Sequence, residues 1–118
     1  MSETYKYSLE IILDHILVCE KRFEEIQQPN DFIATEQGNI LLDAIVTRLQ
    51  AIGENVKRIT KGKTDLVIKY PEVEWSKIIK FRDFISHHYE MLDYEVIFDI
   101  CKIDLHILKV ALQIEIRS

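Results

Sequence analysis

The chain has 118 residues, of which 47% are hydrophobic and 30% charged, with only three glycines and two prolines. This length suits one domain with one core, and the composition excludes disordered, collagen-like and turn-dense all-β proteins. No apolar run approaches the roughly 20 residues that span a bilayer, and residues 1–15 mix acids into the apolar pattern, unlike a signal peptide. Two distant cysteines, Cys19 and Cys101, argue against a disulfide framework or a zinc module. We therefore expect a reduced, cytoplasmic, all-α domain that covers residues 1–118.

Apolar residues recur at helical spacing in four segments, two of them in the first half of the chain. The first covers roughly 4–28 and ends at Pro29, because proline cannot continue the helical hydrogen-bond ladder. The second covers about 35–61 and has the cleanest apolar stripe. It is followed by Gly62, a residue suited to ending a helix.

The second half of the chain is predicted to add two more helices. Residues 64–74 form a connection or one short turn, and a helix follows from about 75 to 89. Asp93 is placed to cap the start of the last helix, because its carboxylate can accept a backbone hydrogen bond there. The predicted fold class is therefore an all-α antiparallel four-helix bundle with short loops.

The last helix carries two apolar stripes, although one is enough for packing in a small bundle. The first stripe comprises Val96, Ile100, Ile103, Ile107, Val110 and Ile114. The second comprises Ile97, Cys101, Leu105, Leu108 and Leu112. One of them must be buried elsewhere, and a second copy of the chain across a two-fold axis is the simplest partner. We predict this homodimer; the alternative is a monomer whose last helix lies at the centre.

Basic residues gather between positions 57 and 82. This window holds eight basic and three acidic residues, a net charge of +5, whereas the rest of the chain holds seven basic and seventeen acidic residues, a net charge of −10. Such a strip on an acidic body can attract an RNA backbone, here through Lys57, Arg58, Lys77 and Lys80. The same side chains can equally be solvated charges on helix ends and a loop.

Polar residues that do not fit the apolar stripes cluster between positions 82 and 89. Arg82 and Tyr89 differ by only about 20° around a helix, so they share a face two turns apart. Asp83 and His87 are four residues apart, close enough for the carboxylate to orient the imidazole. His88 follows His87 directly and could share or replace part of its role.

An arginine and a histidine are chemically sufficient to cleave RNA without a metal. The histidine can take the proton of the ribose 2′-hydroxyl or donate one to the leaving oxygen, and the arginine fork can hold the phosphate as it gains negative charge. One histidine cannot comfortably make both proton transfers, so a dimer that places two copies of the 82–89 cluster across one cleft would supply the second histidine. The alternative is that Arg82 and Asp83 are surface charges and that His87 and His88 merely end a helix.

Other candidate sites are weaker. His15 and Cys19 have i,i+4 spacing but no further ligands at matching positions, so no metal site is predicted. His106 is interpreted as an interface or core histidine, and Asp43, like Asp14 and Asp104, as a solvated helix charge. No phosphate-cradling glycine loop or serine nucleophile elbow occurs, so no cofactor is expected and nucleotide hydrolysis has no support.

Four segments, taken together and in this order, resemble one protein family. They are the motif Arg82-x4-His87-x-Tyr89, the Ile-Gly-Glu of residues 51–58, the Tyr-Pro-x-x-x-Trp of residues 70–79, and residues 93–98 at the start of the last helix. The family is the HepT-like toxins of the HEPN superfamily of helical ribonucleases, and the resemblance covers nearly the whole chain. Glu90 departs from the pattern, because that position is often aromatic in relatives, and its negative charge could weaken RNA binding.

The resemblance implies a homodimer with its cleft between the two motif helices and a metal-independent endoribonuclease in which Arg82 and His87 are catalytic. Asp83 takes the polar position that commonly follows the arginine. In toxin–antitoxin pairs of this kind, a minimal nucleotidyltransferase (MNT-type) antitoxin adds AMP to the motif tyrosine, here Tyr89, which would place phosphate over the site. Two other functions stay open: a non-catalytic helical subunit that binds and positions the nucleotidyltransferase, and a dimeric scaffold with no nucleic-acid role.

Overall fold

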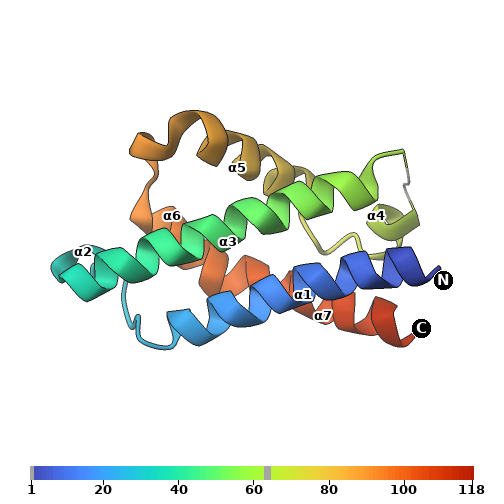
Figure 1. Ribbon diagram of the computed structural model, residues 1–118, viewed down its shortest axis with the longest axis horizontal. Helices are drawn as coiled ribbons and strands as arrows, with labels where there is room; N and C mark the ends of the chain where they lie inside the picture. Colours follow the sequence, from blue (N-terminus) through green and yellow to red (C-terminus); the bar gives the residue numbers. More distant parts are fainter. Residues whose placement is uncertain (1, 63–64) are drawn as a thin grey trace.

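Helices make up almost all of the chain in the computed structural model, which describes residues 2–62 and 65–118 (Figure 1). Lys63, one of the bases of the 57–82 window, and the first residue of the predicted connection lie outside the described residues. The elements are α1 (Glu3–Phe23), α2 (Asp31–Ala34), α3 (Glu36–Thr60), α4 (Asp65–Lys69), α5 (Trp75–His88), the 3-10 turn η1 (Tyr89–Met91), α6 (Tyr94–Asp99), the π-helical η2 (Ile100–Asp104) and α7 (Leu105–Arg117). No strand occurs in these two ranges.

Four long helical segments run alternately up and down, as predicted for an antiparallel four-helix bundle (Figure 1). α3 is the central helix, because it packs against α1 on one side and α5 on the other. α6, η2 and α7 follow one another without a break and form the predicted last helix, which packs against α1. No helix within the described residues combines the length and apolar character that a bilayer crossing requires.

Helix ends follow the local sequence signals except at the end of α1. The carboxylate of Asp93 accepts a hydrogen bond from the backbone N–H of Glu95 at 2.8 Å, which confirms the predicted cap. Gly62 has a φ of +69° just after α3, as its predicted role as a helix terminator requires. α1, however, ends at Phe23 and not near 28. The carboxylate of Asp31 accepts hydrogen bonds from the backbone N–H groups of Gln27 and Gln28. These bonds hold the chain after Phe23 in a turn and not in a helix.

The core is built from one apolar stripe of each long helix. The buried side chains on α1 and α3 include Leu9, Ile12, Ile16 and Cys19, and Ile45, Leu49, Ile52, Val56 and Ile59. The second predicted stripe of the last helix completes the core with Ile97, Cys101, Leu105, Leu108 and Leu112. Burial of this many aliphatic side chains, each worth about 1.5–3 kcal/mol, is the main stabilising contribution to the fold.

The first stripe of the last helix stays largely at the surface of the protomer. Val96, Ile103, Val110 and Ile114 are between 38% and 53% exposed, and Ile100 is buried. His106, between the stripes, is exposed, so it is not a core histidine. An exposed apolar row of this kind suits the predicted contact with a second copy of the chain, and that contact stays a prediction.

The segment before α5 is fixed at the C-terminal end of α7. The Tyr70 hydroxyl donates to Glu115 Oε1 at 2.9 Å, and the Trp75 indole N–H donates to the Tyr70 carbonyl at 3.0 Å. Lys69 Nζ donates to the same Glu115 oxygen at 2.8 Å, and this hydrogen bond is the main reason why the pKa of Glu115 is lowered. The Tyr-Pro-x-x-x-Trp pattern therefore has a structural role, since it sets where α5 begins.

Candidate functional site

The motif residues of α5 and η1 face α3 across a row of polar contacts, which we call the α3–α5 seam. Its four pairs are Asp43–Tyr89 (Oδ1 to the hydroxyl, 2.6 Å), Gln50–Ser86 (Nε2 to Oγ, 3.0 Å), Glu54–Arg82 (Oε2 to Nη2, 3.4 Å) and Lys57–Asp83 (Nζ to Oδ1, 3.9 Å). The two helices are antiparallel, so positions that rise along α3 meet positions that fall along α5. Arg82 and Tyr89 both reach α3, as their spacing predicts.

Arg82 is placed by a close approach of α5 to α3 at Gly53. A Cβ atom added at Gly53 would overlap Cβ of Arg82 and lie 2.9 Å from its Cγ and 3.2 Å from the carbonyl oxygen of Ile78. Only a residue without a side chain fits at this crossing, because backbone and stem atoms cannot move aside as a flexible side-chain tip can. Gly53 therefore determines how near the guanidinium lies to α3.

The guanidinium of Arg82 is held by two carboxylates. Nη1 donates to Asp83 Oδ1 at 3.1 Å and Nη2 to Glu54 Oε2 at 3.4 Å, and these hydrogen bonds raise the pKa of Arg82. Its Nε atom is buried and has no hydrogen-bond partner among the described residues. A buried donor without an acceptor costs about 1–3 kcal/mol, and such groups in folded proteins often mark functional sites.

Asp83 is directed toward cations of the seam. Its Oδ1 atom accepts from Arg82 and lies 3.9 Å from Lys57 Nζ. No hydrogen bond or ion pair joins Asp83 to His87 within the described ranges. The geometry thus supports a role of Asp83 in orienting Arg82, and its predicted action on His87 stays a prediction.

The two histidines of α5 differ in their surroundings. Both are exposed, but the ring of His88 packs against Phe84, with ring centroids 5.1 Å apart. Lys80 is seven residues before His87 and shares its face of the helix, away from the side that meets α3. His87 is therefore the less enclosed imidazole, and it shares its face of α5 with Lys80 and not with Arg82, which faces α3.

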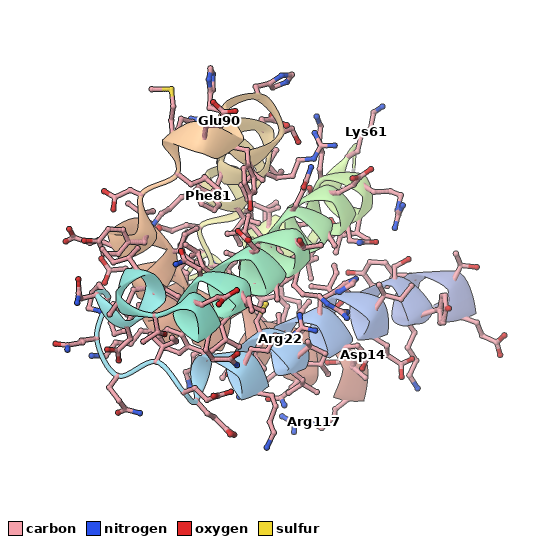
Figure 2. All side chains as sticks on the ribbon, turned by 60° about the vertical axis from the view of Figure 1, so that its left-hand side comes forward. Asp14, Arg22, Lys61, Phe81, Glu90 and Arg117 are labelled. Atoms are coloured by element: carbon pink, nitrogen blue, oxygen red, sulfur yellow. The ribbon has the colours of Figure 1, made fainter. Side chains whose placement is uncertain are left out.

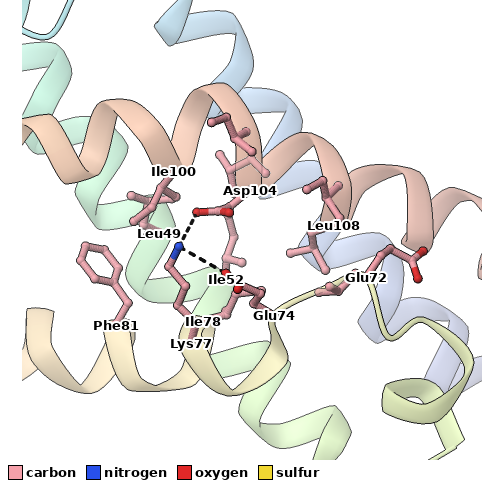
Figure 3. A pocket seen from close by; sticks show the side chains of 14 residues that line it. Leu49, Ile52, Glu72, Glu74, Lys77, Ile78, Phe81, Ile100, Asp104 and Leu108 are labelled. Carbon is pink, nitrogen blue, oxygen red and sulfur yellow. Dashed lines mark hydrogen bonds and ion pairs between the residues drawn. The ribbon is translucent and has the colours of Figure 1, made fainter.

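The four predicted RNA-binding bases do not form one strip. Lys57 and Arg58 lie on α3, where Lys57 is near Asp83 and Arg58 donates to the side-chain oxygen of Asn55. Lys77 points to the other side of α5 and pairs with Asp104 at 3.1 Å and with Glu74 at 3.3 Å (Figure 3). Lys80 is exposed on α5, where it lines a shallow hollow together with Lys77. Two of the four bases thus lie on α3 and two on α5.

A cavity of about 330 Å³ lies between α5 and the last helix, with α3 at its floor (Figure 3). Most of its lining is apolar, and it includes Phe81 of α5 and Ile103 and Ile107 of the last helix. The Lys77–Asp104 pair stands beside it, so Asp104 is not the freely solvated charge that the sequence indicated. Phe81 also lines a shallow hollow with Phe84, between α5 and the segment that precedes it. The two hollows adjoin, because both are lined by Val73 and Phe81 and by the charged Glu74 and Lys77.

Sequence reasoning missed the α3 side of the site. Asp43 was interpreted as a solvated charge, but its carboxylate binds the Tyr89 hydroxyl. In the sequence, Gly53 and Glu54 stand out only as part of the Ile-Gly-Glu segment. The helical spacing of Asp43, Gln50, Glu54 and Lys57 places them on one face of α3, and this was the signal that could have indicated a polar partner for the motif helix.

His15 and Cys19, the other candidate pair, have separate hydrogen-bond partners. His15 Nδ1 is hydrogen-bonded to Arg48 at 3.1 Å, whereas the Cys19 thiol donates toward the Ile45 carbonyl at 3.9 Å. Burial lowers the pKa of His15 and raises the pKa of Cys19 to about 12. Cys19 and Cys101 are both free, buried thiols, as expected of unreactive core cysteines.

Comparisons with known proteins agree on one class. The family model described as "Ribonuclease HepT-like" matches residues 16–114. "Putative RNase MJ0127" of Methanocaldococcus jannaschii is 40% identical over 57 residues, 48% of this chain and 45% of that protein. "Putative RNase TTE0752" of Caldanaerobacter subterraneus subsp. tengcongensis is 32% identical over 90 residues, 74% of this chain and 75% of that protein.

A third relative, "Gamma-glutamylcyclotransferase and putative RNase MJ0434" of Methanocaldococcus jannaschii, is 27% identical over 104 residues, 86% of this chain and 44% of that protein. The matched segments thus span less than half the length of two of these three relatives. No solved structure matches the chain. Because the family model covers most of the sequence and the helical fold agrees with it, this chain belongs to the HepT-like ribonuclease family.

Proposed function

We propose that this chain is a metal-independent endoribonuclease, the toxin of an MNT/HEPN-type toxin–antitoxin pair. The observation that carries the proposal is Arg82, a guanidinium anchored on α3 with an unpartnered buried donor, five residues before an accessible histidine on the same helix. Arg82 and His87 are its catalytic residues, and Asp83 orients the arginine. Lys57, Arg58, Lys77 and Lys80 are the candidates for contacts with the RNA backbone.

The proposed reaction is an internal transfer within RNA. The ribose 2′-oxygen attacks the adjacent phosphorus and gives its proton to one His87, while the bond to the 5′-oxygen breaks and that oxygen receives a proton from a second imidazole. The products are a 2′,3′-cyclic phosphate and a 5′-hydroxyl end. Arg82 stabilises the phosphate while it carries additional negative charge.

The second imidazole comes from a second copy of the chain in this proposal. Ile103 of the exposed stripe and Phe81 of α5 line the same cavity, so a partner that covers the stripe also meets the motif helix. A two-fold axis there brings two copies of α5 into one interface, because a symmetric contact uses the same surface twice.

Replacing Ile103 with glutamate is expected to convert the dimer to a monomer. Ile103 is 53% exposed in the protomer, so the protomer should remain folded, whereas a carboxylate in an apolar interface has no partner for its charge. Light scattering should show half the mass of the wild type, and RNA cleavage should fall at least about tenfold. Ile68→Glu, a 72% exposed position on α4, is the matched control and should leave both unchanged. A wild-type monomer that cleaves RNA would contradict the proposed cleft.

Tyr89 is the proposed acceptor of AMP from an MNT-type nucleotidyltransferase. It is 50% exposed and lies on the same side of α5 as Arg82. A phosphodiester there would add negative charge and bulk beside the arginine, and this charge would compete with the RNA phosphate for Arg82. Modification of Tyr89 would thereby silence the ribonuclease.

A second function is favoured by one observation. Both Nη atoms of Arg82 already donate to carboxylates, and Glu90 adds a further exposed acid next to the motif (Figure 2). A site neutralised in this way suits a non-catalytic helical subunit that binds and positions the minimal nucleotidyltransferase. In that function the motif is a docking surface.

Incubation of the purified chain with total RNA, in the presence of EDTA, distinguishes the two functions. The ribonuclease is expected to cut the RNA and leave 2′,3′-cyclic phosphate ends, which a phosphatase removes only after acid opening of the ring. Loss of cleavage on chelation would contradict the metal-independent reaction. Intact RNA together with tight binding to the transferase would favour the docking subunit.

A further inference from the structure

The Tyr89 hydroxyl donates its hydrogen bond to the carboxylate of Asp43. Asp43 Oδ1 accepts this hydrogen bond at 2.6 Å, a short distance that is typical of a hydroxyl donating to a charged acceptor. Asp43 is exposed on α3, and Tyr89 is half exposed in η1, so the oxygen can be reached from solvent. The contact joins residues 46 apart in sequence and depends on the packing of α5 on α3.

We propose that Asp43 is a catalytic residue for the modification of Tyr89: it takes the phenol proton as the oxygen attacks an activated phosphoryl or acyl group. The inference rests on the proposed function for its biological donor, a nucleoside triphosphate. In that reaction the O–H bond of Tyr89 breaks, its proton moves to the Asp43 carboxylate, the Tyr89 oxygen bonds to the α-phosphorus, and pyrophosphate leaves. The chain that is modified thus supplies its own base.

A base is needed because the free phenolate is scarce. The hydrogen bond to Asp43 raises the pKa of Tyr89, so near neutral pH the oxygen is protonated at the start of the attack. A phenol becomes strongly nucleophilic only as its proton leaves, and a carboxylate already in hydrogen-bond contact can accept that proton without rearrangement. Because the O–H bond of Tyr89 points to Asp43 on α3, the lone pairs of the oxygen face away from that carboxylate.

The Tyr70–Glu115 contact differs from the Tyr89–Asp43 contact in its exposure and its charge. Tyr70 donates to Glu115, but Tyr70 is buried and the carboxylate also binds Lys69. The cation lowers the pKa of Glu115 and so makes it a weaker base. The Asp43 side chain has no ion pair within the described ranges. Tyr89 therefore combines an accessible oxygen with a carboxylate that no cation neutralises.

Acetylation by N-acetylimidazole tests this role without any transferase. The reagent transfers its acetyl group to exposed phenol oxygens, and peptide mass spectrometry measures the rate at each tyrosine. Asp43→Asn is expected to slow acetylation of Tyr89 at least tenfold, because an amide can accept the hydrogen bond but not the proton. Tyr7, 66% exposed on α1, is the internal reference and should react at an unchanged rate. Asp14→Asn, at another exposed aspartate, is the matched control for the lost charge.

A titration followed by phenolate absorbance gives a second measurement, the pKa of Tyr89. This pKa would not change if Asp43 only supported the fold. The difference between the wild type and Tyr89→Phe isolates the titration of Tyr89, and Asp43→Asn should lower that pKa toward the ordinary value of about 10. The variant phenol would then be more acidic and yet slower to react. An unchanged or faster acetylation of Tyr89 in Asp43→Asn would overturn the proposal. Failure of the proposed function is seen separately, as a wild-type Tyr89 that gains no nucleotide from an MNT-type transferase and ATP.

Discussion

Replacing His87 with alanine is expected to lower RNA cleavage by about 100-fold or more. General acid–base groups contribute about 10²–10⁴-fold, and in the proposed dimer one substitution removes the base from one half of the cleft and the acid from the other. His87 is exposed and makes no packing contact with another aromatic ring in the described residues, so the fold should be retained. The measurement is the single-turnover cleavage rate of a labelled RNA, with circular dichroism to confirm the helical content.

His88→Ala is the matched control, since it removes the same group from the next position. Its ring packs on Phe84, so the change should cost a little stability and reduce cleavage by no more than a few fold. If His88→Ala loses more activity than His87→Ala, the catalytic role belongs to His88. Equal losses in both variants would indicate that the two imidazoles divide the proton transfers within one protomer.

The fold was largely predictable because one apolar stripe of each long helix is sufficient to define a small bundle. Leu108 and Leu112 in the last helix and Ile45 and Val56 in α3 are buried as their periodicity indicates. The end of α1 was not predictable in the same way. It depends on a hydrogen bond from the turn to the side chain of Asp31, and helical periodicity carries no information about such a contact.

The α5 part of the candidate site could be predicted from the sequence, but the α3 part could not. Residues of α5 are close in sequence, so helix geometry alone places Arg82 and Tyr89 on one face. Their partners Glu54 and Asp43 come from α3, and which of its residues meet α5 depends on the closeness of the two helices at Gly53. A contact of this kind follows from packing in three dimensions, which a single sequence does not specify.

The charges of the site were also predicted only in part. A basic window suggested a strip for RNA, but Lys77 points to the last helix and is paired with Asp104. Each of the two η nitrogens of Arg82 is paired with an acid. The net charge near the motif is therefore smaller than the sequence window implies. In the proposed ribonuclease, the rate would depend on how well Arg82 can exchange its carboxylates for a phosphate.

In the proposed ribonuclease, Arg82→Lys is accordingly expected to lower cleavage by about 100-fold while the protein stays folded and keeps the oligomeric state of the wild type. Loss of one group that stabilises the developing charge typically costs about 10²–10³-fold, and lysine keeps the charge but lacks the planar fork that binds two phosphate oxygens. The buried Nε donor also disappears, so stability should not fall, and the melting temperature should be equal or slightly higher. The rates are compared with those of Arg117→Lys, the same change at an exposed position on α7. Cleavage within threefold of the wild type would mean that the guanidinium serves only to join Glu54 and Asp83, and the motif would then be a docking surface and not a catalytic one.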